Sequence, residues 1–160
     1  MRDDLLSAFE VQARACEALG SAFTAGLMRL LPGLITPDSG LGRLMEGWQG
    51  GLGPSGASLP LRLAGGLHHL VLTGQAPMLA ACYPPQAGAG LGAALARVLR
   101  DSDAMLTGWM ANAPQTNEVG RSAVLLAAAA AVAHWSALPL QVSELGASAG
   151  LNLNFALYRL

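Results

Sequence analysis

Charged residues are scarce in this chain of 160 residues. They make up 12% of the sequence, against 52% hydrophobic residues, whereas a typical soluble domain contains roughly 25% charged residues. So few charges leave much of the exterior apolar, and such a surface is expected to face other protein. The composition therefore predicts either a homo-oligomer, such as a dimer, or contact with a missing C-terminal domain of the same protein.

The sequence also lacks a basic run and has few aromatic residues. The formal net charge is −1 and aromatic residues make up 5%, which leaves nucleic-acid binding without electrostatic support. No stripe of basic residues fits an anionic membrane surface. The longest apolar run without a charge, Ser122 to Leu138, is rich in alanine and contains His134, so we expect it to be too short and too weakly apolar to span a bilayer. Neither nucleic acid nor a membrane is an expected partner.

An export signal and paired cysteines are missing as well. The first residues, MRDDLLSAFE, place acids where a signal peptide has its basic region, which predicts a cytoplasmic protein. Cys16 and Cys82 are far apart and show no CxxC spacing. In the cytoplasm such cysteines are expected to be buried as small apolar residues rather than joined in a disulfide.

What the sequence does contain, up to residue 138, is apolar residues at helical spacing. On the first segment Leu5, Phe9, Ala13 and Cys16 fall on one face. The sequence predicts a mainly α-helical domain over residues 1–138, arranged as a multi-helix orthogonal bundle. Its expected helices cover about residues 5–20, 22–31, 40–48 (with Asp38 as cap), 59–73, 77–83, 91–111 and 118–135.

The pattern changes at Pro139. The run LPLQVSELG has β-type character and ends at a glycine turn, and AGLNLNFALYRL then resumes helical spacing. Residues 139–160 are therefore predicted to form one β-loop-α unit that looks like the start of a truncated Rossmann-like domain. Because one strand cannot form a sheet, Leu140–Ser143 is expected either to pair with a second chain or to lie irregularly against the helices.

The glycine turn itself has the spacing E-x-G-x-S-x-G. Glycine permits a tight turn and a close approach of the backbone to a ligand. The turn resembles the first motif of the S-adenosylmethionine-dependent methyltransferases, with serine in place of the middle glycine. That resemblance implies cofactor contacts, at the methionine end, from Glu144, Gly146, Ser148, Gly150 and Asn152. The alternative interpretation is a tight strand-to-helix turn without a ligand, which needs small residues at the same positions.

Two further readings of polar residues stay open. Gly146–Gly150 also fits the G-x-S-x-G elbow of the α/β-hydrolases, although no acid and histidine follow Ser148 to complete a triad. The polar cluster QTNEVGR either caps the long helix or binds substrate. The substrate-binding hypothesis names Gln115, Asn117, Glu118 and Arg121, with Arg121 holding a carboxylate or phosphate.

Histidines provide no metal site in the sequence. His68 and His69 are adjacent, so they point about 100° apart on a helix and cannot share one ion. His134 is distant and has no acid or cysteine beside it. One of the adjacent pair is expected to serve in helix packing.

Longer segments carry a wider resemblance. The chain is similar to the bacterial domain-of-unknown-function family 2332 through LPLRLAGGLHHLVLTGQAPMLAACYP, PQTNEVGRSAVL and LQVSELGASAGLNLNF. Members are about twice this length, which implies that the chain corresponds to the N-terminal half of a methyltransferase-like protein. S-Adenosylmethionine is then a possible cofactor of the full-length protein, and tight binding by this chain alone is not expected. The alternative is a non-catalytic helical module that serves interaction or assembly.

Overall fold

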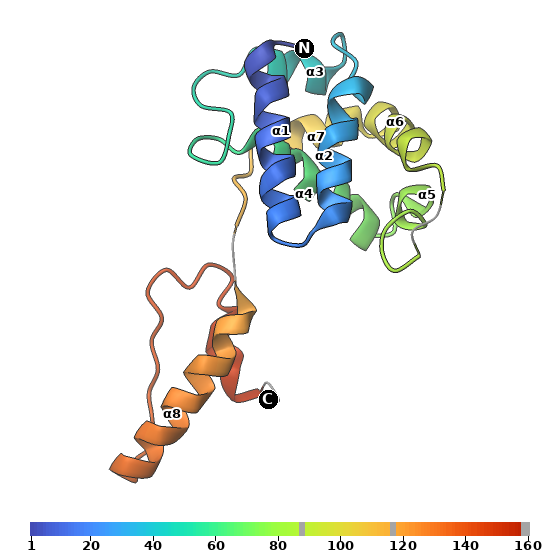
Figure 1. Ribbon diagram of the computed structural model, residues 1–160. Helices are drawn as coiled ribbons and strands as arrows, with labels where there is room; N and C mark the ends of the chain where they lie inside the picture. The colour runs from blue at the N-terminus through green and yellow to red at the C-terminus, as the bar shows by residue number, and fades with distance from the viewer. Residues whose placement is uncertain (87–88, 116–117, 158–160) are drawn as a thin grey trace. The chain divides into compact units, whose positions relative to one another are not determined.

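Apolar residues at spacings of three and four produce α-helices along most of the chain, and the expectation of a mainly helical protein is confirmed. The computed structural model describes residues 1–86, 89–115 and 118–157 (Figure 1), and these ranges contain helices and no strand. The chain divides into two compact units, Met1–Pro114 and Gln115–Leu160. The alanine-rich helix belongs to the second compact unit, because it packs with the short helices on either side of the glycine turn's segment.

The first unit is built from helices alone. They are α1 (Asp3–Ala18), α2 (Ala22–Leu34), α3 (Gly40–Glu46), α4 (Leu59–Leu72), α5 (Pro77–Ala80), α6 (Leu91–Asp101) and α7 (Asp103–Trp109). In Figure 1, α1 and α2 lie side by side. α4 packs against α1, α2, α5 and α7, so it holds the centre of this unit.

The buried faces of the helices follow the sequence pattern. On α1, Leu5, Phe9, Ala13 and Cys16 are all buried, as their spacing predicts. On α4 the buried leucines at 59, 63, 67 and 70 form one stripe. Both cysteines are buried and free. Apolar burial on these faces is the main source of stability for the unit.

Several helix ends differ from the sequence prediction. Ser39, not Asp38, caps α3, because its hydroxyl accepts a hydrogen bond from the Gly42 N–H at 2.9 Å. α2 continues through Pro32 to Leu34, since proline removes only its own N–H and the Ile35 N–H still bonds to the Leu31 carbonyl. The helix predicted over residues 91–111 is broken at Ser102, whose ψ of 20° leaves the helical region.

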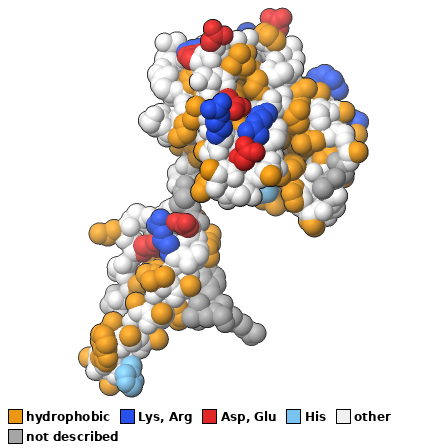
Figure 2. Space-filling view, viewed as in Figure 1, with side chains coloured by type: hydrophobic (Ala, Val, Ile, Leu, Met, Phe, Trp, Pro, Cys, Tyr) orange, Lys and Arg blue, Asp and Glu red, His pale blue; other side chains and the backbone are white. Residues whose placement is uncertain are grey.

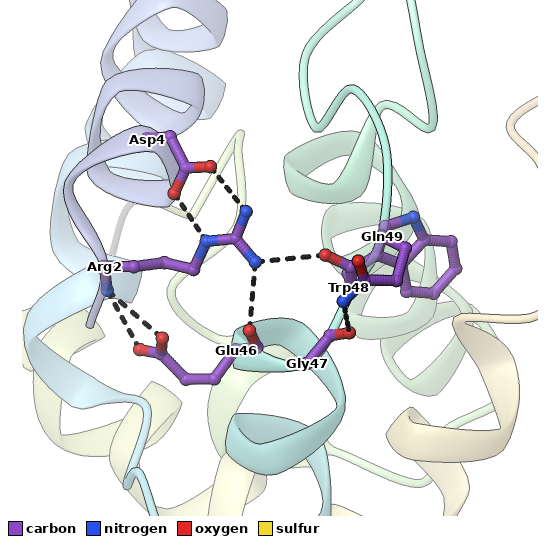
Figure 3. A network of polar contacts seen from close by, with 6 residues as sticks. All are labelled: Arg2, Asp4, Glu46, Gly47, Trp48 and Gln49. Carbon is purple, nitrogen blue, oxygen red and sulfur yellow. Dashed lines mark hydrogen bonds and ion pairs between the residues drawn. The ribbon is translucent and has the colours of Figure 1, made fainter.

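A polar network joins the start of α1 to the end of α3 (Figure 3). The Arg2 guanidinium donates through Nη1 to the carbonyl oxygens of Glu46 and Trp48, both at 3.0 Å. The backbone N–H of Arg2 donates to the Glu46 carboxylate at 3.0 Å, and Asp4 accepts from the guanidinium at 2.6 Å. One arginine thus satisfies two carbonyl groups at the C-terminal end of α3.

The adjacent histidines each lie against an aromatic ring, although the His68 side chain is exposed. His68 stacks on Tyr83 with 5.8 Å between ring centroids, and His69 stacks on Trp109 with 4.6 Å. α4 and α7 approach closely at Gly66, where an added Cβ would lie 2.9 Å from Leu106 Cδ2. In the part of the chain that the structure describes, no three His, Cys, Asp or Glu side chains gather as metal ligands.

The second unit contains the short 3₁₀ helix η1 (Val119–Arg121), the helix α8 (Ser122–Ser136) and the 3₁₀ helix η2 (Leu151–Leu157). Residues 139–144 form no strand, so the truncated Rossmann-like unit predicted for residues 139–160 is not formed as such. A strand depends on a neighbour for its backbone hydrogen bonds, and no other described segment of this unit is extended beside it. In this single chain the segment lies irregularly, and its pairing with a second chain stays a prediction.

α8 exposes most of its surface. Ser122 is its single buried residue, while Val124 is 71% and Trp135 is 81% exposed. Figure 2 shows apolar side chains over this unit. The sequence analysis expects this region to be too weakly apolar for a membrane span, yet by length and composition alone Val119–Ser136 is long and apolar enough to cross a bilayer. The apolar surface that the composition predicts is therefore seen on α8, where several large apolar side chains are exposed.

Candidate functional site

The glycine turn is shaped by residues with left-handed backbone conformations. Gly146 and Gly150 have φ of +70° and +72°. These values are accessible to glycine without strain, which explains why the turn needs both. Ser148 has φ of +53°, a conformation that costs a non-glycine residue roughly 1 kcal/mol. Gly146 and Gly150 are therefore required by the turn itself, whatever it binds.

A buried chain of polar side chains lies behind this turn. The Ser122 hydroxyl donates to Asn152 Oδ1 at 3.1 Å, and Asn152 Nδ2 donates to Glu144 Oε1 at 3.3 Å. Ser122 and Asn152 are each only 3% exposed. The second carboxylate oxygen, Glu144 Oε2, is buried and has no hydrogen-bond partner. A buried carboxylate oxygen without a hydrogen-bond donor destabilises the folded state by about 1–3 kcal/mol or more, so a ligand that donates to it would be stabilised here.

A cavity of about 400 Å³ lies against this carboxylate. Its walls are mainly apolar, and Arg121, Glu144 and Asn152 supply its charged and amide groups. The remaining lining residues are Val124, Leu125, Val142, Ser143, Leu153 and Phe155. An apolar cavity with a few polar groups is the usual form of a small-molecule site.

The structure brings together two clusters that were predicted separately. Ser148 Oγ donates to Gln115 Oε1 at 3.2 Å, so the glycine turn contacts the QTNEVGR segment. Arg121 of that segment lines the same cavity as Glu144. Arg121 also pairs with Glu118 at 2.9 Å, the i,i+3 ion pair of the capping interpretation. Asn117, named in the substrate hypothesis, lies outside the described residues.

Ser148 lacks the partners of a hydrolytic nucleophile. Its hydrogen-bond acceptor is the side-chain amide oxygen of Gln115. An amide is too weakly basic to remove the hydroxyl proton, whereas an elbow serine needs a histidine at this place. The positive φ of Ser148 resembles an elbow, but the chemistry of its partner does not.

Ser122 is the site residue that the sequence interpretation missed. It is the first residue of α8 and precedes a run of alanine, valine and leucine. One feature of the sequence could have pointed to it. Ser122 begins the apolar run that ends at Leu138, and a hydroxyl buried in such a run needs a hydrogen-bond partner. Its partner is Asn152, thirty residues later, which no local pattern reveals.

A second large cavity lies in the first unit, and the carboxylate of one of its lining residues, Asp103, already accepts hydrogen bonds through both oxygens. It encloses about 480 Å³ beside α3 and α6, with Asp38, Arg100 and Asp103 among its lining residues. Both oxygens of Asp103 already accept backbone N–H groups, from Gly40 at 2.8 Å and Leu41 at 2.9 Å. Its carboxylate is committed to the α3 terminus, unlike that of Glu144.

Comparison with known proteins gives one match. A family model described as "Uncharacterized protein conserved in bacteria (DUF2332)" matches residues 6–160. No curated protein and no solved structure matches the chain. The matched region includes nearly all of the first compact unit and the whole of the second, so both belong to the same family region.

Proposed function

The chain belongs to the DUF2332 family of uncharacterized proteins conserved in bacteria, and we propose that its residues 115–152 are the first part of an S-adenosylmethionine site in a methyltransferase-like protein. The observation that carries this proposal is the buried, unpartnered Oε2 of Glu144, a residue that lines an apolar cavity. A buried carboxylate is stable when it faces a cation or a donor. The methionine end of this cofactor carries two positive centres, an ammonium and a sulfonium.

The residues present fit that end of the molecule in three respects. Glu144 offers the anionic acceptor, and Arg121 lines the same cavity, where its guanidinium suits a carboxylate. Gly146 and Gly150 keep the turn free of side chains on the backbone. When bound, the cofactor would supply an electrophilic methyl group. The role of this chain is to bind and orient the methionine end.

Binding by this chain is expected to be weak. The methyltransferase resemblance places a ribose-binding acid after a second strand, and the described ranges contain no strand at all. With only the methionine end held, ordering the rest of the ligand offsets much of the gain from contacts. We therefore expect affinity poorer than low-micromolar.

The test is a titration of isotope-labelled protein with S-adenosylmethionine, followed by NMR. We expect saturable shifts at the backbone amides of Gly146 and Gly150 and at the side-chain amide of Asn152. Glu144→Gln keeps the side-chain shape and removes the charge, so it should abolish these shifts. Shifts that are absent at saturating millimolar cofactor, or that persist unchanged in Glu144→Gln, would count against the proposal.

A second candidate function is supported by the exposed face of α8. Val124 and Trp135 are 71% and 81% exposed, and the helix carries no Asp, Glu, Lys or Arg. Such a surface favours assembly with a second chain or with a C-terminal domain over solvation. Sedimentation of the wild type and of Trp135→Glu tests this function: self-association that the substitution abolishes supports a homo-oligomer, and a monomer at all concentrations contradicts it.

A further inference from the structure

The direction of the hydrogen bonds around Asn152 is set by charge. The Asn152 amide has an acceptor oxygen and an NH₂ donor group, and it faces Ser122 on one side and Glu144 on the other. A carboxylate only accepts, so the NH₂ group must face Glu144 and the oxygen must face Ser122. The Ser122 hydroxyl then has to act as the donor. The three groups form a chain with one possible polarity.

Ser122 is placed to enforce that polarity. It is 3% exposed, and it starts α8, so its position is fixed by the helix. Without its hydroxyl, Asn152 Oδ1 would be buried without a donor, and the amide would gain by moving away from Glu144 toward another donor. The orientation of Asn152 therefore depends on a residue that lines no part of the cavity.

We propose that Ser122 is a positioning residue of this site, which holds Asn152 against Glu144 Oε1 so that the buried Oε2 is left to accept from an ammonium group of the ligand. The inference rests on the proposed function and adds to it the residue that orients the acid and the group that the acid selects. A hydrogen-bond donor is required at Oε2, because a sulfonium attracts a carboxylate but donates no hydrogen bond.

The first measurement uses the ligand-free chain and follows the Asn152 side-chain amide by NMR. In the wild type we expect slow exchange of the Nδ2 protons with water. Ser122→Ala should speed that exchange about tenfold, since one hydrogen bond to a charged network is lost. Ser122→Thr, which keeps the hydroxyl, should retain the wild-type rate, and Asn154→Ala is a control at an exposed asparagine of the same 3₁₀ helix. Unchanged exchange in Ser122→Ala, with the helix intact by circular dichroism, overturns the positioning role.

The second measurement compares three probes in the same spectra. S-Adenosylmethionine and S-adenosylhomocysteine both carry the ammonium, whereas the deaminated analogue of S-adenosylhomocysteine keeps the carboxylate and lacks only the ammonium. We expect both ammonium-bearing probes to bind about tenfold more tightly than the deaminated analogue. Ser122→Ala should reduce this preference and Ser122→Thr should restore it.

The outcomes separate the two proposals. Equal binding of all three probes overturns the ammonium assignment while the cavity remains a ligand site. Failure of every probe to bind overturns the proposed function and the ammonium assignment together, and the exchange measurement still decides the role of Ser122. A preference that survives in Ser122→Ala contradicts the positioning role directly.

Discussion

The carboxylate of Asp103 accepts a hydrogen bond from the backbone N–H of Gly40 at 2.8 Å, across 63 residues of sequence. Its other oxygen accepts from the Leu41 N–H at 2.9 Å, so the first residue of α7 caps the first turn of α3. The same residue begins the helix that follows the break at Ser102. Two short helices, each too short to be stable alone, are thereby fixed to one another.

Removing this tertiary cap should destabilise the first unit. We expect Asp103→Ala to lower the free energy of unfolding by about 1–2 kcal/mol, because two part-buried N–H groups lose their acceptor. Asp103→Asn keeps one acceptor and should lose less. Urea denaturation measures both. Asp101→Ala is the control, since its ion pairs are exposed and worth at most about 1 kcal/mol. Equal losses from Asp103→Ala and Asp101→Ala would contradict the capping role.

Adjacent glycines of α4 should respond oppositely to alanine. A Cβ at Gly66 would lie 2.9 Å from Leu106 Cδ2 and 3.0 Å from Trp109 Cδ1, whereas at Gly65 its nearest neighbour is Trp109 Nε1 at 3.5 Å. Gly65→Ala should stabilise the protein by up to about 1 kcal/mol through helix propensity. Gly66→Ala should destabilise it by about 1–2 kcal/mol, because overpacking exceeds that gain. Thermal unfolding followed by tryptophan fluorescence separates the two variants, and a shared sign would refute the close packing of α4 on α7.

Alkaline pH should weaken the first unit through Tyr83. Burial raises the pKa of its phenol to about 12 from the ordinary value of 10.0. Between these two values the unfolded chain has released a proton that the folded chain keeps. The free energy of unfolding therefore falls as the pH rises through this window, and the contribution of Tyr83 is fully present below it. Because the ring is partly exposed and packs on Phe23 and His68, we expect a loss of about 1 kcal/mol.

The measurement is urea denaturation at a series of pH values from neutral to strongly alkaline. Tyr83→Phe removes the titrating group and should flatten the profile in that window. A profile that has the same slope in the wild type and in Tyr83→Phe would assign the alkaline loss to other groups.

The two asparagines of η2 should differ in importance. Asn152→Ala removes the donor to Glu144 Oε1 and the acceptor of Ser122, leaving buried polar atoms on both sides. We expect it to destabilise the second unit by about 1–3 kcal/mol, seen as faster amide exchange in α8 and η2. Asn154→Ala, at an exposed position, should leave exchange near the wild-type rate. Loss of protection in both variants would indicate that η2 tolerates no alanine, rather than that Asn152 has a special role.

The sequence predicted what depends on local spacing. The buried face of α1 and the extent of α4 follow from apolar residues three and four apart, with Pro60 near the start and Gly74 after the end. One of the ranges that failed ends beside a residue whose partner is distant in the chain. The break at Ser102 comes directly before Asp103, whose carboxylate binds the α3 terminus, and nothing in residues 91–111 encodes that contact.

The tight turn was predictable from the sequence, and the side chains that support it were not. Gly146 and Gly150 were expected to form a turn because glycine spacing indicates backbone conformation directly, while their cofactor contacts stay a prediction. Ser122 was missed because one serine before an alanine run has no local signature. The strand at residues 140–143 was predicted from β-type residues, yet such residues form a strand only where another extended segment accepts their hydrogen bonds.

Ser148 stands in the one place where the turn departs from the three-glycine motif, and its φ of +53° is the conformation that a glycine would adopt there. The exchange of glycine for serine therefore leaves the path of the main chain intact and adds a single tether, the hydroxyl bound to Gln115. Ser148→Gly should remove the backbone strain at this position, so it should be neutral or stabilising for the loop. It should also remove the hydrogen bond to Gln115, so the segment around the cavity should become more mobile.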